Sequence, residues 1–367
     1  MDENDDPLIT DCQSKMFGIY YTTKESFTAF DALFTNKQGL QDKFVDYWNH
    51  TSARFAKNKY VVGYDPFNEP LAGNAWQDLT LEVPGIADRK LLDPMYSRVY
   101  EKYIANDDKS IMWFEPPPQP DTLPIGGGLV SPVGFTKPPG GNTGSANHVL
   151  NDHTYCCAMV PSACSDGEPL PEHAETCMAF HRAKLGTRTF DAKRLGIPLF
   201  ITEFGACFTE GPCTQEINQV AQAADEQLVG WAYWQFKYFA DLTTSAGTHS
   251  EGVYNHDGSL QTFKVKALAR SYMQRTQGTP TKMSFDTDTS AFTFDFDVNT
   301  DIDQPSVGYF SQEYWYENGL TYTLTASGRE LRSPDDFTAE YKDNFLTFKV
   351  ANKSLNHQSV TLQVTKK

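Results

Sequence analysis

Residues 60–70 read YVVGYDPFNEP, a short apolar run that ends in a polar cluster containing Asn68 and Glu69. A second run of the same kind, PLFITEFG at 198–205, contains Glu203. Short apolar runs bounded by turn residues are typical of strands that are buried inside a parallel sheet. The two stretches therefore predict a parallel sheet in which two strands end at a glutamate.

Outward from these stretches, predicted strands alternate with predicted helices. Strands are predicted at 60–66, 110–114, 148–153, 197–201 and 229–234, and helices at 40–58, 93–105, 173–194, 214–228 and 260–274. This alternation is typical of parallel strands joined by crossover helices. We therefore expect a (β/α)8 barrel of the α/β class, which carries its active site at the carboxyl ends of the strands.

The pattern changes near Pro280. Apolar and polar residues alternate with period two at 292–298, 345–350 and 360–364. This alternation indicates antiparallel strands, and several such strands in a short region are typical of a sandwich. We therefore assign the catalytic barrel to residues 1–278 and a C-terminal β-sandwich domain to 279–367.

Counted back from the sandwich, the predicted barrel strands are numbers four to eight. A complete barrel has about 250 residues, or about 31 per βα unit, so three units occupy about 90–95 residues. Only about 59 residues precede Tyr60, and they show no series of three strands. We therefore expect a barrel that lacks about its first three βα units. Either the natural protein is longer, or this form is not a competent enzyme.

The composition argues against several functions. The net charge is −16, from 47 acidic and 31 basic residues, whereas a nucleic-acid-binding surface needs clustered Lys and Arg. No apolar run reaches the roughly 18 residues of a membrane span. The first residues, MDENDDP, lack the basic and then apolar order of a signal peptide, so we expect no signal peptide in this chain.

Six of the seven cysteines lie between residues 156 and 213, in segments rich in Pro, Gly and Ser. Their spacing does not fit a zinc site, so we favour loop disulfides and an oxidising compartment. Cys207 and Cys213 flank one short loop and are expected to pair, and at least one further pair should close the insertion at 157–177. Cys12 is expected to be unpaired.

Two carboxylates at the ends of parallel strands are the groups that a retaining glycosidase needs. One carboxylic acid protonates the leaving oxygen, and one carboxylate attacks the anomeric carbon. A strand-end glutamate taken singly is more often a salt-bridge partner. Asn-Glu-Pro after an apolar strand, followed three βα units later by Glu203, is more specific.

The chain resembles glycoside hydrolase family 5 and, within it, the endoglycoceramidases. The stretches that carry the resemblance span most of the chain and read VVGYDPFNEP, HTYC, PLFITEFGA, GWAYWQF and RSYMQRTQGTP. The resemblance implies hydrolysis of the bond between the reducing-end glucose and the ceramide of a glycosphingolipid, with retention and with no metal or organic cofactor. Together with the cysteines, it implies a location outside the cell or in the lysosomal or endosomal lumen. We also expect contact with a membrane surface or micelles, and the sequence indicates no obligate protein partner.

The resemblance also implies roles for single residues. Glu69 matches the general acid/base and Glu203 the nucleophile, while Asn68 would hydrogen-bond the 2-hydroxyl of the sugar. Tyr155 would orient the carboxylate of Glu203. His153 would hold the acid/base or the sugar.

Trp234 would form the floor under the reacting glucose. Each of these two residues has a structural alternative: His153 could be a core histidine, and Trp234 could serve ordinary packing. Glu115, after the second predicted strand, could bind sugar, but we favour a structural role for it.

Two other functions remain open at this point. One is another β-glucosidic activity of the same family, on a polysaccharide or on glucosylceramide. The other is a non-catalytic protein that binds glycan or lipid, which the missing strands would explain.

Overall fold

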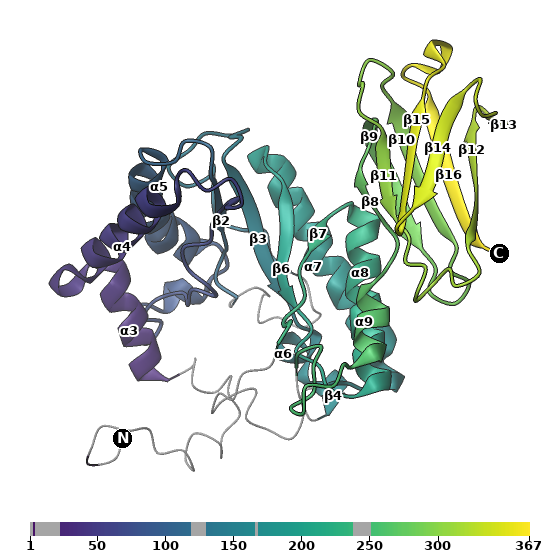
Figure 1. Ribbon diagram of the computed structural model, residues 1–367. Helices are drawn as coiled ribbons and strands as arrows, with labels where there is room; N and C mark the ends of the chain where they lie inside the picture. Colours follow the sequence, from purple (N-terminus) through teal and green to yellow (C-terminus); the bar gives the residue numbers. More distant parts are fainter. Residues whose placement is uncertain (1–2, 4–22, 119–129, 166–167, 238–250) are drawn as a thin grey trace. The chain divides into compact units, whose positions relative to one another are not determined.

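A computed structural model describes residues 3, 23–118, 130–165, 168–237 and 251–367 (Figure 1). The chain divides into two compact units. The first comprises Met1–Ala206 and Gly230–Glu251, and the second comprises Cys207–Val229 and Gly252–Lys367. Among the helices of the described residues, none has both the length and the apolar character needed to cross a lipid bilayer.

The first unit is built on a parallel sheet whose strands follow one another in chain order. The order is β1-β2-β3-β6-β7, and every neighbouring pair is parallel. The strands are β1 (Gly63–Tyr64), β2 (Ile111–Phe114), β3 (His148–Thr154), β6 (Leu199–Phe204) and β7 (Gly230–Trp231). This order is that of consecutive strands in a (β/α)8 barrel, so the predicted fold class is confirmed. Within the described residues the sheet does not close, because β1 and β7 each pair with one strand.

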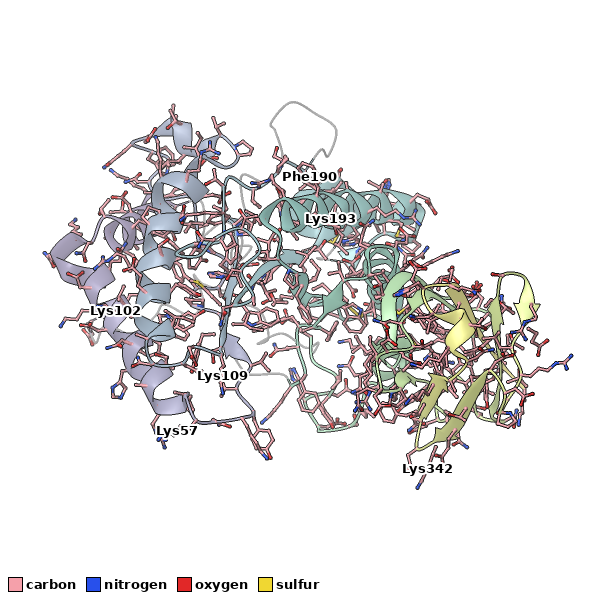
Figure 2. The ribbon with its side chains drawn as sticks, turned by 90° about the horizontal axis from the view of Figure 1, so that it is seen from above. Lys57, Lys102, Lys109, Phe190, Lys193 and Lys342 are labelled. Atoms are coloured by element: carbon pink, nitrogen blue, oxygen red, sulfur yellow. A yellow bond between two sulfur atoms is a disulfide. The ribbon has the colours of Figure 1, made fainter. Side chains whose placement is uncertain are left out.

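Helices α3 (Lys24–Phe34), α4 (Leu40–Phe55), α5 (Asp93–Ile104) and α7 (Ala174–Leu195) belong to the same unit. Proline in the first turn of α5 lacks the N–H that would be unpaired there, and Gly196 ends α7 in the left-handed region with φ of 69°. Helix α7 packs against β3 and β6. The outer sides of α5 and α7 carry exposed lysines such as Lys102 and Lys193 (Figure 2).

Two disulfides close the insertion between β3 and α7. Cys156–Cys177 joins α6 (Cys156–Met159) to α7, and Cys157–Cys164 joins α6 to β4 (Cys164–Ser165), which pairs with β5 (Glu168–Pro169). In the second unit Cys207 and Cys213 are joined, with their Cα atoms 5.1 Å apart. The predicted loop disulfides are therefore confirmed, whereas Cys12 lies outside the described residues.

The second unit contains α8 (Glu210–Gln227), α9 (Thr262–Leu268) and two antiparallel sheets. The sheet orders are β13-β12-β16-β10-β9 and β14-β15-β11-β8. The strands are β8 (Tyr272–Arg275), β9 (Gly278–Phe285), β10 (Phe292–Val298), β11 (Ser306–Tyr309), β12 (Leu320–Ala326), β13 (Arg329–Glu330), β14 (Phe337–Lys342), β15 (Phe345–Val350) and β16 (Ser359–Lys366). Alternate side chains such as Phe294, Phe348 and Leu362 form one shared core, which is the arrangement of a β-sandwich.

The predicted helix at 260–274 was wrong in its second half. The helix ends at Leu268, and Tyr272–Arg275 forms β8, which pairs with β11. Tyr272 lies opposite Tyr309, and their ring centroids are 5.6 Å apart. This pairing across the sheet overrides the local helical pattern.

Candidate active site

The predicted site residues follow the carboxyl ends of neighbouring strands of the first unit. Glu69 lies five residues after β1, His153 lies in β3 and Tyr155 directly after it, and Glu203 lies in β6. Trp234 follows β7 and forms a parallel bridge with Gly205. Because parallel strands end at one edge of the sheet, side chains that are far apart in the sequence converge there.

Glu69, His153 and Glu203 form a compact cluster. The Nδ1 atom of His153 lies 2.8 Å from Oε1 of Glu69 and 3.9 Å from Oε1 of Glu203. One carboxylate oxygen of Glu69 and one of Glu203 are within 4.8 Å of each other. The hydroxyl of Tyr155 donates a hydrogen bond of 2.7 Å to Glu203, which confirms the contact expected for Tyr155.

The backbone of Glu69 is strained. Its φ is 44°, in the left-handed region that non-glycine residues seldom adopt, and the next residue is Pro70. Strain of this kind costs about 1–3 kcal/mol and is often found where a side chain must be aimed at a reacting group. In this conformation Oε1 of Glu69 lies within hydrogen-bond distance of Nδ1 of His153.

The electrostatics of the cluster depend on His153, whose side chain is almost completely buried. Although burial disfavours the imidazolium, the hydrogen bond to Glu69 and the charges of Glu115 and Glu203 raise the pKa of His153 to about 9. Burial also raises the pKa of Glu203, an effect that His153 and the hydroxyl of Tyr155 oppose. Near neutral pH His153 is therefore an imidazolium that donates to Glu69 from Nδ1.

Glu115 lies directly after β2 and is 2% exposed. Its Oε2 atom is 3.8 Å from Nε2 of His153, on the opposite side of the ring from Glu69. Burial raises the pKa of Glu115 well above its ordinary value, and the imidazolium of His153 opposes that rise. The hydroxyl of Tyr96 donates to the main-chain oxygen of Glu115.

Trp234 is 42% exposed, so its ring is not packed in a core. Its indole N–H donates to Oε2 of Glu251 over 3.1 Å, and the side-chain amide of Gln235 also donates to this oxygen. Glu251 is almost completely buried, and sequence reasoning missed it. Asn68, by contrast, is exposed beside Glu69.

Another buried group of charges lies behind β3 and has a structural role. The carboxylate of Asp152 contacts Lys184 at 2.9 Å and also contacts Arg188, both from α7. Burial would raise the pKa of Asp152, but these two cations hold it below its ordinary value. Since all three side chains are buried, this group anchors α7 to the sheet.

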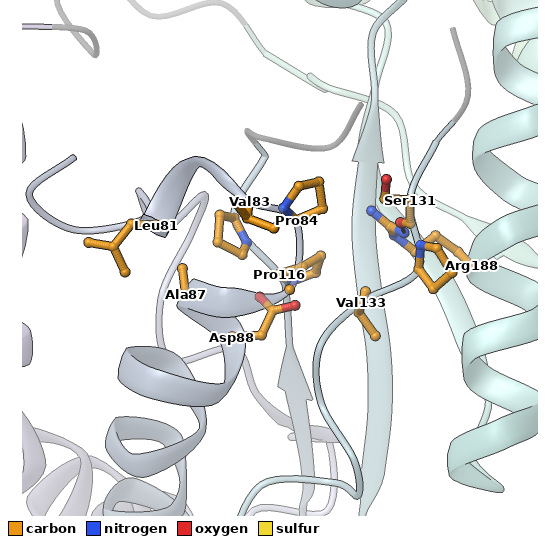
Figure 3. Close-up of a pocket in the computed structure, with 12 residues that line it drawn as sticks. Leu81, Val83, Pro84, Ala87, Asp88, Pro116, Ser131, Val133 and Arg188 are labelled. Atoms are coloured by element: carbon orange, nitrogen blue, oxygen red, sulfur yellow. Dashed lines mark hydrogen bonds between the residues drawn. The ribbon is translucent and has the colours of Figure 1, made fainter. Parts of the chain in front are cut away.

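A cavity of about 10 Å³ lies between Pro116, Val133 and Arg188 (Figure 3). Asp88 lines the same cavity and accepts a hydrogen bond from the backbone N–H of Gly134. A volume of this size holds about one water molecule, whereas ligand sites measure about 300–1,000 Å³. The cavity is therefore too small to bind a sugar.

Glu69, His153 and Glu203 also form a donor set of a kind that could hold a metal ion, since their ligand atoms lie within 4.8 Å of one another. A metal needs a neutral imidazole, however, and the raised pKa of His153 favours a proton at this ring. The arrangement is therefore better suited to proton transfer.

Two adjacent glutamates at one edge of a parallel sheet are the arrangement that a retaining glycosidase needs, and comparison with known proteins identifies the family. Residues 20–240 match the family described as "Cellulase (glycosyl hydrolase family 5)", and residues 270–364 match "Glycoside hydrolase family 5 C-terminal domain". The chain therefore belongs to glycoside hydrolase family 5.

The relatives of the chain include endoglycoceramidases of two animals. It is 26% identical to the endoglycoceramidase of Cyanea nozakii over 325 residues, which cover 87% of this chain and 58% of that protein. It is 25% identical to that of Hydra vulgaris over 335 residues, which cover 90% of this chain and 57% of that one. The chain thus spans a little over half the length of these relatives.

A solved structure with the same fold is endo-glycoceramidase II from Rhodococcus sp. in a complex with ganglioside GM3. The TM-score is 0.68 and the sequence identity 20%, with 95% of this chain and 69% of that chain covered. The resemblance to endoglycoceramidases is therefore confirmed in both sequence and fold.

Proposed function

We propose that the chain carries the catalytic residues of a retaining glycoside hydrolase that cleaves the glucose–ceramide bond of glycosphingolipids. The observation that carries the proposal is the pair of glutamates, whose nearest oxygens lie within 4.8 Å. Retaining enzymes place their carboxyl groups about 5–5.5 Å apart, whereas inverting enzymes leave about 6.5–9.5 Å for a water molecule. The names of the relatives, endoglycoceramidases, support the choice of substrate.

In the first step, the carboxylate of Glu203 attacks the anomeric carbon of the glucose. Glu69 gives its proton to the glycosidic oxygen, so that ceramide leaves as an alcohol and a glycosyl ester forms on Glu203. In the second step, Glu69 takes a proton from water, which attacks the same carbon and releases the sugar. The two inversions give net retention.

The neighbouring side chains act on these two groups and on the sugar. Tyr155 fixes the orientation of the attacking carboxylate, and His153 holds Glu69 through Nδ1. Trp234 has an exposed ring, which we assign to the floor beneath the sugar, and we assign the exposed Asn68 to the 2-hydroxyl. Glu251 holds the indole of Trp234 in place.

The three disulfides support a location in an oxidising compartment, either outside the cell or in the lysosomal or endosomal lumen. At such a place the enzyme would meet its substrate in a membrane surface or in micelles.

The proposal is tested with a chain extended at its N-terminus by the matching upstream segment of an endoglycoceramidase. Lactosylceramide, glucosylceramide and a cello-oligosaccharide are offered separately, and the anomeric form of the first sugar product is followed by NMR. We expect ceramide release from lactosylceramide with a β-anomeric product. Cleavage of the cello-oligosaccharide or glucosylceramide alone would favour another activity of the family, and an α-anomeric product would contradict retention.

The hydrogen bond from Tyr155 gives a prediction about pH. Glu203 must be ionised to attack, and the donated hydrogen bond favours its ionised form. In Tyr155→Phe the pKa of Glu203 should rise further, so the acidic limb of kcat/KM should move to higher pH by about one unit.

The control is Tyr341→Phe, which removes a tyrosine hydrogen bond to the main-chain oxygen of Phe310 in the sandwich. This variant should leave the acidic limb unchanged. An unchanged acidic limb in Tyr155→Phe would show that this hydrogen bond does not control Glu203.

A further inference from the structure

The imidazole of His153 lies between two carboxyl groups that belong to different strands. Nδ1 is 2.8 Å from Glu69, and Nε2 is 3.8 Å from Glu115. The side chain of Glu115 is 98% buried, since its exposed fraction is 2%. Its Oε1 atom has no hydrogen-bond partner within the described part of the chain. A carboxyl group in such a place is costly unless an opposite charge faces it.

The charged groups around His153 come from every strand that flanks it. Asp65 and Glu69 follow β1, Glu115 follows β2, and Glu203 lies in β6; all four interact with the charge of the imidazole. Asp152, next to His153 in β3, contacts Lys184 and Arg188 from α7. Around His153 the described neighbours are thus mainly acidic, and the imidazolium is the cation that faces Glu115.

We propose that Glu115 is a positioning residue that acts through His153: the two side chains form a buried ion pair in which each favours the charged form of the other, and this pair directs Nδ1–H of the ring at Glu69. The part of this inference that concerns catalysis rests on the proposed function. When Glu69 has given its proton to the leaving oxygen, it is a carboxylate that accepts a hydrogen bond from a cation. Glu115 favours that cation in both steps, because its carboxyl group faces Nε2 and so leaves Nδ1–H free to donate to Glu69.

The test is the titration of His153 in the 367-residue chain, followed by NMR on histidine-labelled protein. The signal of His153 is assigned by its loss in His153→Gln. In Glu115→Gln one negative neighbour is removed and the side-chain shape is kept, so the midpoint of His153 should fall by about one pH unit or more. In Glu115→Asp, which keeps the charge, the midpoint of His153 should return most of the way to its value in the unmodified chain. An unchanged midpoint in a folded Glu115→Gln variant would overturn the proposal.

The matched control is Asp107→Asn, which neutralises another buried carboxylate of the same unit. Asp107 accepts hydrogen bonds from Tyr64 and Ser110 and has no described contact with His153. This variant should leave the midpoint of His153 in place. If it lowers that midpoint as much as Glu115→Gln does, the effect is general and the proposal fails.

A measurement on the unmodified protein covers the case in which Glu115→Gln does not fold. The carboxyl carbon of Glu115 should change its chemical shift in the same pH range as His153, because the two groups titrate as a pair. Independent titration of the two groups would overturn the proposal.

Activity is a separate readout. In an active extended chain, Glu115→Gln should move the alkaline limb of kcat/KM to lower pH. A shifted His153 midpoint in a chain that hydrolyses no glycoside would leave the pairing established and reject the proposed function. If the extended chain hydrolyses glycosphingolipid but the midpoint of His153 is unshifted in Glu115→Gln, the proposed function stands and the pairing is rejected.

Discussion

Replacing Glu203 with glutamine is expected to lower kcat by about 10⁴-fold or more in the extended chain, because an amide cannot form the glycosyl ester. The shape of the side chain is kept, and the hydroxyl of Tyr155 can still donate to its oxygen. The loss should therefore fall on kcat, with little change in the binding of glycosphingolipid. Ceramide release at saturating substrate measures it, and circular dichroism checks that the variant is folded.

The control for this variant is Glu340→Gln, an exposed glutamate of β14 in the sandwich. It should keep the full rate. If Glu203→Gln retained more than about a tenth of the rate, Glu203 would not be the nucleophile, and the retaining mechanism built on it would have to be abandoned.

The 367-residue chain by itself is expected to hydrolyse glycosphingolipid at least about 10²-fold more slowly than the extended chain. Displacements of about 1 Å in a catalytic group can cost this much. Within the described residues, β1 and β7 each have one neighbouring strand, and Val62, just before β1, is 65% exposed. A sheet with two such edges holds Glu69 less firmly than a closed one does.

The measurement compares ceramide release by the short chain, the extended chain and the extended Glu203→Gln variant at equal concentration. Equal rates for the short and extended chains would show that the five strands are sufficient. If the extended chain bound glycolipid but released no ceramide, the protein would be a glycan- or lipid-binding protein.

The sequence predicted the parts of the site that depend on strand ends. The runs before Asn68-Glu69 and around Glu203 are short and apolar, and two such strands that run parallel in one sheet bring their glutamates to the same edge. The alternation at 292–298 likewise predicted a strand whose alternate side chains enter the sandwich core. These features follow from the apolar pattern of each strand and from the rule that parallel strands of one sheet end at the same edge.

Other parts of the site depend on contacts between segments that have no signal of their own. Glu251 lies in no predicted strand or helix, and its role is visible only where it meets the indole of Trp234. Glu115 was noted, but no pattern shows that it faces Nε2 of His153. For the same reason β8 was predicted as the end of a helix, because its partner β11 lies about 30 residues later.

The disulfides that follow Tyr155 have a practical consequence for making the protein. Cys156 and Cys157 are the two residues after the tyrosine, and they are bonded to Cys177 and Cys164, respectively. In a host whose cytosol is reducing, these bonds would not form, and the segment that anchors Tyr155 would lose both cross-links. Recombinant production should therefore direct the chain to the periplasm or the secretory pathway, and purification buffers should contain no thiol reductant.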